Sequence, residues 1–442
     1  MSLLKIVQWR DLENWSANYY FQKINNSSNF QFVCLDNIIK EENNKIKPFE
    51  NPEKEFGILG VNNKIGIFDN EIMLGKNIKQ PYKIVENNFI SYNPYRVNVG
   101  SIGIKTKEQK FNLISSAYVV FSCNENKILP NFLFLLFKTN NFNQTIRDNT
   151  KGSVRQTLSF DILSSLKIPL PPLNIQEQFV ANYQEKMTKI AQLKQEIEHI
   201  EEDSKNYLLS MLGLEKNISE QQKTKENLLF FKKWSEIKDW GVESNLLKEF
   251  NATSNYPITA IKEMAEINPK TELKNLNSCS FLPMEAVSTD GFILKNEEQN
   301  TKNSKGFTKF QENDIIWAKI TPCMQNKKSA ICKNLINGIG FGSTEFYVFR
   351  IKENTNLNFL YHFLRNDYFI EIAKKNFKGS AGQQRVPKSF LENFQIPLPP
   401  LNIQQEISSH LDELQEQIDK KKEEMAYLEM LAKSEFEQAV FA

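Results

Sequence analysis

The chain has 442 residues, of which 40% are hydrophobic and 24% are charged. At about 150 residues per domain this length allows two or three domains, and the composition is typical of a folded, soluble protein rather than a disordered one. The longest run of aliphatic and aromatic residues, Phe132–Phe137, is much shorter than the roughly 20 apolar residues of a membrane helix. Because the first ten residues also lack an export signal, we expect a cytoplasmic protein without a membrane partner.

The cysteines and histidines do not indicate a metal site. The five cysteines are odd in number and form no Cys-x-x-Cys pair, which favours reduced, mostly buried thiols over disulfides or zinc ligands. The three histidines, His199, His362 and His410, are scattered along the chain. The sequence therefore predicts no metal site and no histidine-based chemistry.

Three short segments resemble catalytic or cofactor motifs only in part. The glycines of Gly338–Gly342 are not followed by the acidic residue of a dinucleotide-binding loop, so a turn before a strand explains them. Gly75-Lys76 lacks the other residues of a phosphate-binding loop. Tyr92–Tyr95 is similar to the Asn-Pro-Pro-Tyr motif of amino-methyltransferases but lacks one proline. We therefore expect no catalytic residue in this chain, which is not an enzyme by itself.

Charge alternates along the chain, although the net charge is only +2. Residues 1–167 contain 21 basic and 15 acidic side chains, and residues 217–395 contain 25 and 20. In contrast, residues 168–216 contain 5 basic and 8 acidic side chains, and residues 396–442 contain 4 and 10. Two separate basic blocks suit a polyanion that contacts both of them, because binding to phosphates releases counterions. Solvated lysines would give the same charge count.

An identical nonapeptide shows that the chain is an internal duplication. The sequence Ile-Pro-Leu-Pro-Pro-Leu-Asn-Ile-Gln occupies Ile168–Gln176 and recurs 228 positions later at Ile396–Gln404. The similarity continues about 18 residues upstream of each nonapeptide, and a pair of tryptophans precedes each copy. A period of this length indicates duplicated domains rather than a solenoid of short repeats.

A long helix is predicted after each nonapeptide. The Pro-Pro pairs that end at Pro172 and Pro400 cannot lie inside a helix, so we expect the helices to begin near Gln176 and Gln404 and the first to end at Gly213. Mostly apolar residues then follow the a and d positions of a heptad repeat, which favours antiparallel pairing of the two helices. In the first helix these positions are Phe179, Tyr183, Lys186, Ile190, Leu193, Ile197, Ile200, Ser204, Tyr207 and Met211. In the second they are Ile407, Leu411, Leu414, Ile418, Lys421, Met425, Leu428, Ala432, Glu435 and Ala439.

The block before each nonapeptide reads as a strand-rich domain. Runs of β-branched and aromatic residues between Gly, Asn and Asp indicate strands, and two stretches late in the blocks have helical spacing. The strands are predicted over Phe56–Val61, Ala117–Phe121, Asp314–Trp317 and Glu345–Ile351, and the helices over 129–138 and 358–366. The predicted fold class is therefore α+β, with two strand-rich domains separated by two long antiparallel coiled-coil helices and related by an internal pseudo-twofold duplication.

The repeat also predicts the domain boundaries. The first domain covers 1–167, including an N-terminal extension over 1–27, and the first helix covers 168–213. A polar linker and a second extension follow over 214–253. The second domain then covers 254–395, and the second helix 396–442.

Nearly the whole chain resembles the specificity subunit of Type I restriction-modification enzymes. The resemblance is carried by the two nonapeptides with their helices and by three further phrases, Tyr92–Ser101, Ala318–Lys328 and Gly342–Phe346. It implies that each strand-rich block is a target-recognition domain that reads one half of a split, asymmetric DNA site. The helices would set the spacing of the half-sites and dock the modification subunits.

The resemblance also implies the partners and cofactors. The partners would be double-stranded DNA, two modification (methyltransferase) subunits and the restriction subunits, which are ATP-dependent nucleases. No cofactor is expected in this chain, whereas S-adenosylmethionine, ATP and Mg would be bound by the partner subunits. The Trp-containing extension before each domain departs from the family pattern. It leaves the specificity subunit of a Type II (IIB-like) system as an alternative.

The candidate DNA-binding residues are side chains that can read base edges or phosphates and that follow a Pro or Gly turn. In the first domain they are Tyr95, Arg96, Asn98, Ser101, Lys151, Arg155 and Gln156. In the second domain they are Lys319, Thr321, Gln325, Asn326, Lys327, Lys328, Ser343, Thr344, Glu345, Lys378, Gln383, Gln384 and Arg385. Two other classes of function remain open at this point. One is a coiled-coil adaptor that binds other proteins, and the other, disfavoured by the missing motifs, is a self-sufficient methyltransferase.

Overall fold

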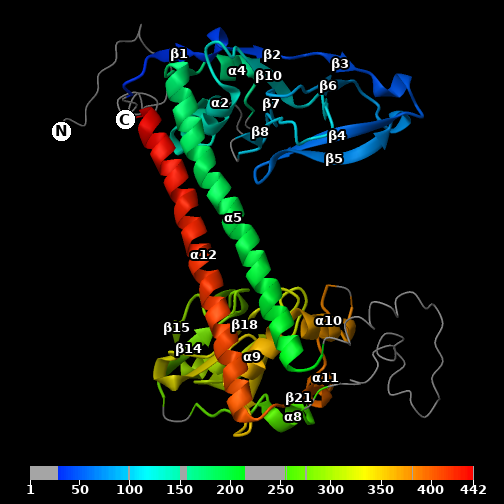
Figure 1. Ribbon diagram of the computed structural model, residues 1–442, viewed down its shortest axis with the longest axis vertical. Coiled ribbons are helices and arrows are strands. Elements are labelled where there is room, and N and C mark those ends of the chain that lie inside the picture. Colours follow the sequence, from blue (N-terminus) through cyan, green and yellow to red (C-terminus); the bar gives the residue numbers. More distant parts are fainter. Residues whose placement is uncertain are drawn as a thin grey trace. The chain divides into compact units, whose positions relative to one another are not determined.

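The computed structural model describes residues 28–97, 100–149, 157–214, 254, 256–273, 276–380 and 382–441. The predicted extension over 1–27 and the linker residues 215–253 lie outside the described residues. The chain divides into two compact units, Met1–Lys194 together with Lys422–Ala442, and Gln195–Lys421. Each unit therefore holds one strand-rich domain and a part of each long helix (Figure 1).

The domain in the first unit has three sheets, with strand orders β3-β6-β9-β4-β5, β2-β10-β7-β8 and β1-β11. Its strands are β1 (Phe32–Cys34), β2 (Ile39–Glu41), β3 (Lys45–Ile46), β4 (Glu55–Asn62), β5 (Gly66–Leu74), β6 (Tyr82–Ile84), β7 (Ile90–Tyr92), β8 (Ile102–Ile104), β9 (Leu113–Ser115), β10 (Val119–Cys123) and β11 (Lys167–Pro169). Its helices are η2 (Leu35–Asn37), η3 (Pro48–Glu50), η4 (Gly75–Asn77), α2 (Pro130–Phe137), α3 (Asn140–Asn149) and α4 (Phe160–Ser164).

The domain in the second unit also has three sheets, with strand orders β15-β14-β19-β16, β13-β20-β17-β18 and β12-β21. Its strands are β12 (Ile258–Ala260), β13 (Ala265–Ile267), β14 (Ser278–Leu282), β15 (Glu297–Asn300), β16 (Thr308–Gln311), β17 (Ile315–Ala318), β18 (Ser329–Ile331), β19 (Ile339–Gly342), β20 (Phe346–Ile351) and β21 (Gln395–Pro397). Its helices are α8 (Ile261–Met264), η7 (Met284–Ala286), η8 (Thr301–Ser304), η9 (Ile336–Gly338), α9 (Leu357–Arg365), α10 (Asp367–Lys375) and α11 (Lys388–Asn393).

The two domains share one sheet topology, which confirms the duplication inferred from the nonapeptides. The shared sheet has four strands, with the order β2-β10-β7-β8 in the first domain and β13-β20-β17-β18 in the second. Counted along the chain, the first strand of each sheet pairs with the fourth, the fourth with the second, and the second with the third. Every pairing in these two sheets is antiparallel. The four predicted strands coincide with β4, β10, β17 and β20 to within two residues, and the two predicted helices with α2 and α9. The α+β prediction is therefore confirmed.

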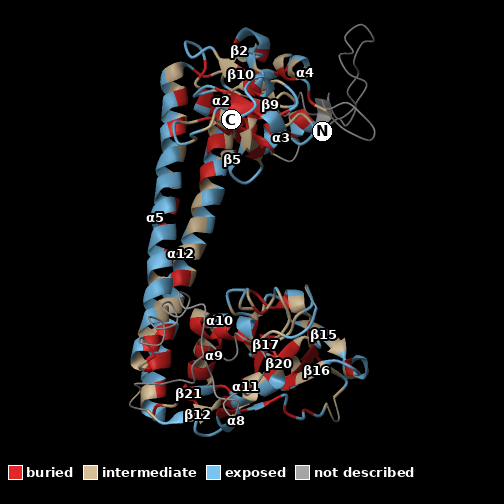
Figure 2. Cartoon of the chain, turned by 90° about the vertical axis from the view of Figure 1, so that its right-hand side faces the viewer, coloured by how far each residue is buried: buried red, intermediate tan, exposed pale blue. Residues whose placement is uncertain are grey.

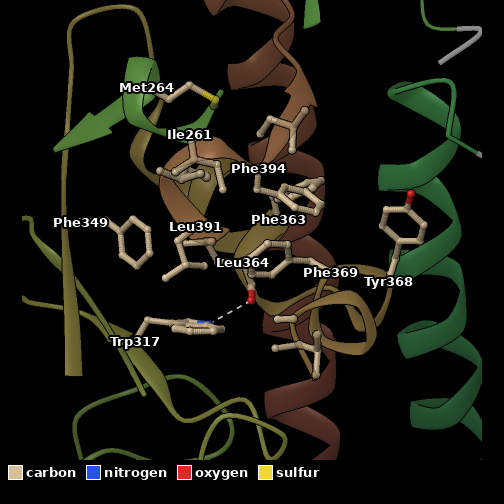
Figure 3. Close-up of a cluster of buried hydrophobic side chains, with 14 of the residues drawn as sticks. Ile261, Met264, Trp317, Phe349, Phe363, Leu364, Tyr368, Phe369, Leu391 and Phe394 are labelled. Atoms are coloured by element: carbon tan, nitrogen blue, oxygen red, sulfur yellow. Dashed lines mark hydrogen bonds between the residues drawn. The ribbon is translucent and has the colours of Figure 1, made fainter. Parts of the chain in front are cut away.

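Large aromatic side chains form the core between sheet and helices in the second unit. Trp317, on the central strand β17, is 1% exposed, and its indole nitrogen donates a hydrogen bond to the carbonyl oxygen of Leu364 at 3.2 Å. Figure 3 shows this bond together with the rings of Phe363, Phe369 and Phe394, which pack against one another. Because these rings come from α9, α10 and the end of α11, the core fixes the helices against the sheet.

The two long helices are α5 (Leu173–Met211) and α12 (Leu401–Phe441). Each begins directly after its Pro-Pro pair, three residues earlier than predicted. The carbonyl oxygen of Pro172 accepts hydrogen bonds from the backbone nitrogens of Ile175 and Gln176, and this closes the first turn. Helix α5 ends as predicted, because Gly213 adopts the left-handed conformation with φ of 68°.

Predicted heptad positions on each helix contact the other helix, and some of their partners, such as His410, Glu196 and Phe436, were not predicted. In the second unit the ring of Tyr207 contacts that of His410 in a tilted arrangement, with centroids 4.3 Å apart, and Lys421 is paired with Glu196. Residues later in α5 thus contact residues earlier in α12, so the two helices are antiparallel. In the first unit Phe179 contacts Phe436 at 6.3 Å. The other faces of both helices are exposed (Figure 2).

The predicted pairing residues lie on these inner faces. Their side chains are buried or half-buried: Phe179, Tyr183, Ile190, Leu193, Ile197, Ile200, Ile407, Leu411, Leu414, Ile418, Met425 and Leu428. The exposed residues between them are mostly charged or polar, so both helices are amphipathic.

Candidate nucleic-acid interface

Two predicted DNA-binding phrases occupy equivalent places in the two domains. Residues 93–101 connect β7 to β8, and residues 319–328 connect β17 to β18. When the strands of each four-stranded sheet are counted along the chain, these two strands are the second and the third. Both connections therefore leave the same edge of the same architecture, although the two phrases have little sequence in common.

In each domain, residues at or just after the second predicted segment bond to the first: Leu158 in the first domain, and Gln384 and Val386 in the second. In the second domain the backbone nitrogen of Val386 donates to the carbonyl oxygen of Lys319 at 3.0 Å, and that of Thr321 donates to Gln384 at 3.0 Å. In the first domain the backbone nitrogen of Leu158 donates to the carbonyl oxygen of Pro94 at 3.0 Å. Leu158 and Val386, which are related by the 228-residue repeat, thus each donate a backbone hydrogen bond to the neighbouring connection.

A tyrosine hydroxyl supports this contact in both domains. The hydroxyl of Tyr92 donates to the carbonyl oxygen of Leu158 at 3.2 Å, and the hydroxyl of Tyr347 donates to that of Val386 at 2.9 Å. Burial raises the pKa of both tyrosines, so both hydroxyls stay protonated and act as donors at neutral pH.

Residues 378–385 form a hairpin beside the 319–328 connection. The backbones of Lys378 and Arg385 exchange two hydrogen bonds of 2.9 Å. Gly379 and Gly382 have φ of 119° and 81°, which only glycine adopts at low cost. The tip carries the exposed side chain of Gln383, and Gln384 lies half-buried behind it.

Glu345 and Arg385 join the three predicted segments of the second domain. The guanidinium of Arg385 donates to both carboxylate oxygens of Glu345, at 2.8 and 2.9 Å. This hydrogen bonding lowers the pKa of Glu345 below its ordinary value. The backbone nitrogen of Lys319 donates to the carbonyl oxygen of Glu345 at 2.9 Å, and its ammonium group lies 5.1 Å from the ring centroid of Tyr347. The segments containing Lys319, Glu345 and Arg385 therefore form one cluster.

Several of the predicted residues hold the cluster together. The hydroxyl of Thr321 donates to the amide oxygen of Gln325 at 2.7 Å, so the group that Gln325 can offer a base is its amide nitrogen. Lys327 is paired with Asp367 at 2.5 Å, and Lys328 donates to the carbonyl oxygen of Met284 at 3.0 Å. In the second domain the predicted residues with exposed side chains are Asn326, Thr344, Lys378 and Gln383.

The 93–101 connection presents Tyr95 and Arg96 to solvent, and Tyr95 is 56% exposed. Ser101 differs from the expectation of a surface residue. Its side chain is 4% exposed, and its hydroxyl donates to the carbonyl oxygen of Val61 at 3.1 Å, so it joins the connection to β4. The remaining predicted residues of this domain, Asn98, Lys151, Arg155 and Gln156, lie outside the described residues.

Two buried glutamines were not predicted as part of the site but tie each long helix to its domain. Gln176 and Gln404, the last residues of the two nonapeptides, are 0% exposed. The amide of Gln176 donates to the carbonyl oxygens of Pro171 and Lys127 and accepts from the backbone nitrogen of Leu129. In the same way, the amide of Gln404 donates to the carbonyl oxygens of Pro399 and Asn354 and accepts from the backbone nitrogen of Asn356. The identity of the repeat up to its last residue is the signal that marks them.

Two further features of the described residues are the state of the cysteine thiols and the hydropathy of the helices. All five cysteines are free, and Cys279 and Cys332 are buried, whereas Cys34, Cys123 and Cys323 are half-buried rather than buried as expected. In the parts of the chain that the structure describes, no helix has the length and apolar character needed to cross a bilayer.

Comparison with known proteins identifies the family. The family model of the Type I restriction modification DNA specificity domain matches residues 23–202 and 244–430. The chain belongs to this family. The two matched regions each contain one copy of the strand-rich domain and most of the helix that follows it.

Individual members of the family are similar over shorter stretches. The specificity subunit of the Type I restriction enzyme EcoEI of Escherichia coli is 38% identical over 157 residues, which are 35% of this chain and 26% of the relative. That of EcoAI, also of Escherichia coli, is 39% identical over 164 residues, which are 36% of this chain and 28% of the relative. The matches thus span about a quarter of the length of these two specificity-domain proteins.

The fold is shared along nearly the whole chain. One chain in a solved structure, described as the structural basis of complex assembly and conformational transition of the type I R-M system, superimposes with a TM-score of 0.53. The match covers 93% of this chain and 97% of that chain at 16% sequence identity. This similarity supports the fold of two strand-rich domains and two long helices.

Proposed function

We propose that this protein is the noncatalytic DNA specificity subunit of a Type I restriction-modification system. Each strand-rich domain reads one half of a split, asymmetric DNA site, and the paired helices set the spacing and dock two modification subunits. Methylation with S-adenosylmethionine takes place in those subunits, and ATP- and Mg-dependent cleavage takes place in the restriction subunits. The proposal places no catalytic step in this chain.

The observation that carries the proposal is the equivalent placement of the two loop clusters. Two copies of one sheet present the connections 93–101 and 319–328 at the same edge, and the two connections differ in sequence. A duplicated scaffold with different loops is what a reader of two different half-sites requires. Exposed Arg96, Asn326 and Gln383 are side-chain types that bind base edges.

An exchange of domains tests the proposal. The full chain is reconstituted with its modification subunits, and residues 28–167 or 254–395 are replaced by the equivalent block of another specificity subunit. We expect methylation at a split motif with one modified adenine on each strand, and each exchange to alter one half of the motif. Binding should weaken steeply as salt rises. A chain that binds no DNA together with these subunits, or exchanges that alter both halves, would contradict the proposal.

A further inference from the structure

The turn between β4 and β5 is a rigid tip with exposed side chains. Asn63, Lys64 and Ile65 are all exposed, and Ile65 is 70% exposed. The amide oxygen of Asn62 accepts hydrogen bonds from the backbone nitrogens of Lys64 and Ile65, at 2.9 and 2.7 Å. Gly66 then turns the chain into β5 with φ of 81°. The backbone that carries the three side chains is therefore ordered by hydrogen bonds within the turn itself.

The tip lies against the 93–101 connection. The hydroxyl of Ser101 donates to the carbonyl oxygen of Val61, and the backbone nitrogen of the same Ser101 donates to the carbonyl oxygen of Arg96, both at 3.1 Å. Strand β5 also packs directly on β8, because a Cβ atom added to Gly103 would lie 2.3 Å from the backbone nitrogen of Ile67. Figure 1 shows the turn of the β4–β5 hairpin beside β8.

We infer that Asn63, Lys64 and Ile65 are DNA-contacting residues that extend the reading surface formed by Tyr95 and Arg96. The inference rests on the proposed function and names residues for the first half-site. An exposed isoleucine alone would need no explanation. Here it stands on a hydrogen-bonded turn, next to a lysine and an asparagine, and adjoins the connection that carries an exposed tyrosine and arginine.

The chemistry of the three side chains fits duplex DNA. An asparagine amide donates and accepts in one plane, as an adenine edge requires, and an aliphatic side chain contacts the methyl group of thymine. A lysine contacts phosphate and contributes equally to all sequences. We therefore assign sequence discrimination to Asn63 and Ile65 and backbone binding to Lys64.

Strand β5 supplies a matched control. Ile72 is 59% exposed and lies on β5, where it pairs with Gly57 of β4. It is seven residues from Ile65, or about 20 Å along an extended strand. Ile72→Ala removes the same aliphatic side chain as Ile65→Ala from the same hairpin, but away from the 93–101 connection.

The experiment compares single variants of the full chain, reconstituted with modification subunits on DNA that carries the methylated motif. We expect Ile65→Ala and Asn63→Ala to reduce discrimination about 5- to 100-fold at one or two bases of the half-site read by the first domain. The second half-site should not change. Lys64→Ala should weaken binding to all sequences and reduce the slope of log K against log[salt] by about 1. Ile72→Ala should match wild type.

Two results would overturn the inference while the proposed function stands. In one, the wild-type complex reads its split site and all three tip variants keep its motif, affinity and salt slope. In the other, Ile72→Ala changes the motif as much as Ile65→Ala does, which would trace the effect to the hairpin as a whole. Thermal unfolding of each variant checks that the domain is intact. A wild-type complex without sequence-specific binding would instead overturn the proposed function and this inference together.

Discussion

Lys186 and Glu435 form an ion pair of 2.8 Å at two heptad positions where apolar residues would be expected. Lys186 is half-buried, whereas Glu435 is exposed beside the buried Phe436, so the two charges neutralise one another at the edge of the seam. The positions related to them by the 228-residue repeat are Leu414 and Tyr207, which carry no charge. The repeat therefore contains no second copy of this ion pair. It forms when α5 pairs with α12 but cannot form when α5 pairs with a second α5.

The first prediction concerns a half-chain, residues 1–216. In the full chain Ile190, Leu193 and Ile197 are buried. In the half-chain they lose α12 and become an exposed apolar stripe, which should associate with an identical copy. In that dimer Lys186 faces Tyr207 and loses its carboxylate partner. We expect dimerisation at tens of micromolar, measured by sedimentation equilibrium, and tighter association for Lys186→Leu. With modification subunits the dimer should methylate a palindrome built from the first half-site. A fragment that stays monomeric with and without the substitution would show that the seam does not drive pairing.

The second prediction concerns the buried glutamines. Gln176→Leu leaves the backbone nitrogen of Leu129 and two carbonyl oxygens without their partner. An unsatisfied buried group costs about 1–3 kcal/mol, so we expect the free energy of unfolding to fall by about 3 kcal/mol in urea titrations. Gln178→Leu, on the exposed face of α5, is the control. Equal stability of the two variants would contradict a role for the amide.

The third prediction concerns pH. The pKa of Glu345 is lowered in the folded protein by the hydrogen bonds from Arg385. Its pairing therefore stabilises the fold above the ordinary carboxyl pKa of 4.5, and this stabilisation is lost as the pH falls through the lower folded-state value. The stability difference between wild type and Glu345→Gln should shrink from about pH 6 to about pH 3. A constant difference for Glu345→Gln across this range would contradict the prediction.

The fourth prediction concerns the helices as a spacer. Seven residues inserted after Lys194 in α5, together with seven inserted after Lys421 in α12, preserve the heptad seam and add about 10 Å. We expect the gap in the methylated motif to grow by about three base pairs, at roughly 3.4 Å each. Two-residue insertions at the same places rotate the seam by about 200° and should abolish assembly. Methylation at the original spacing after the seven-residue insertions would contradict a spacer role.

The repeat, the helices and the strand-rich domains could be predicted because each depends on local sequence. The Pro-Pro pairs and the heptad spacing need no knowledge of distant contacts, and neither do the aromatic strands. Two placements could not be predicted in this way. Ser101 is buried by Val61, forty residues earlier in the chain, and the Asn62–Ile65 tip joins the candidate site through the same long-range contact. The connections 93–101 and 319–328 share almost no residues, so only the topology shows that they are equivalent.

The glutamine links at the start of each long helix have a mechanical consequence. A helix of 39 residues such as α5 is about 58 Å long. A swivel of only about 5° at its first turn would displace its far end by about 5 Å, more than the rise of one base pair, roughly 3.4 Å. Gln176 binds the helix to the Pro-Pro segment and to the loop before α2 with one rigid amide group. Together with the packing of Phe179 and Val180 against the core of the same domain, this buried amide restricts such a swivel at the first turn of α5.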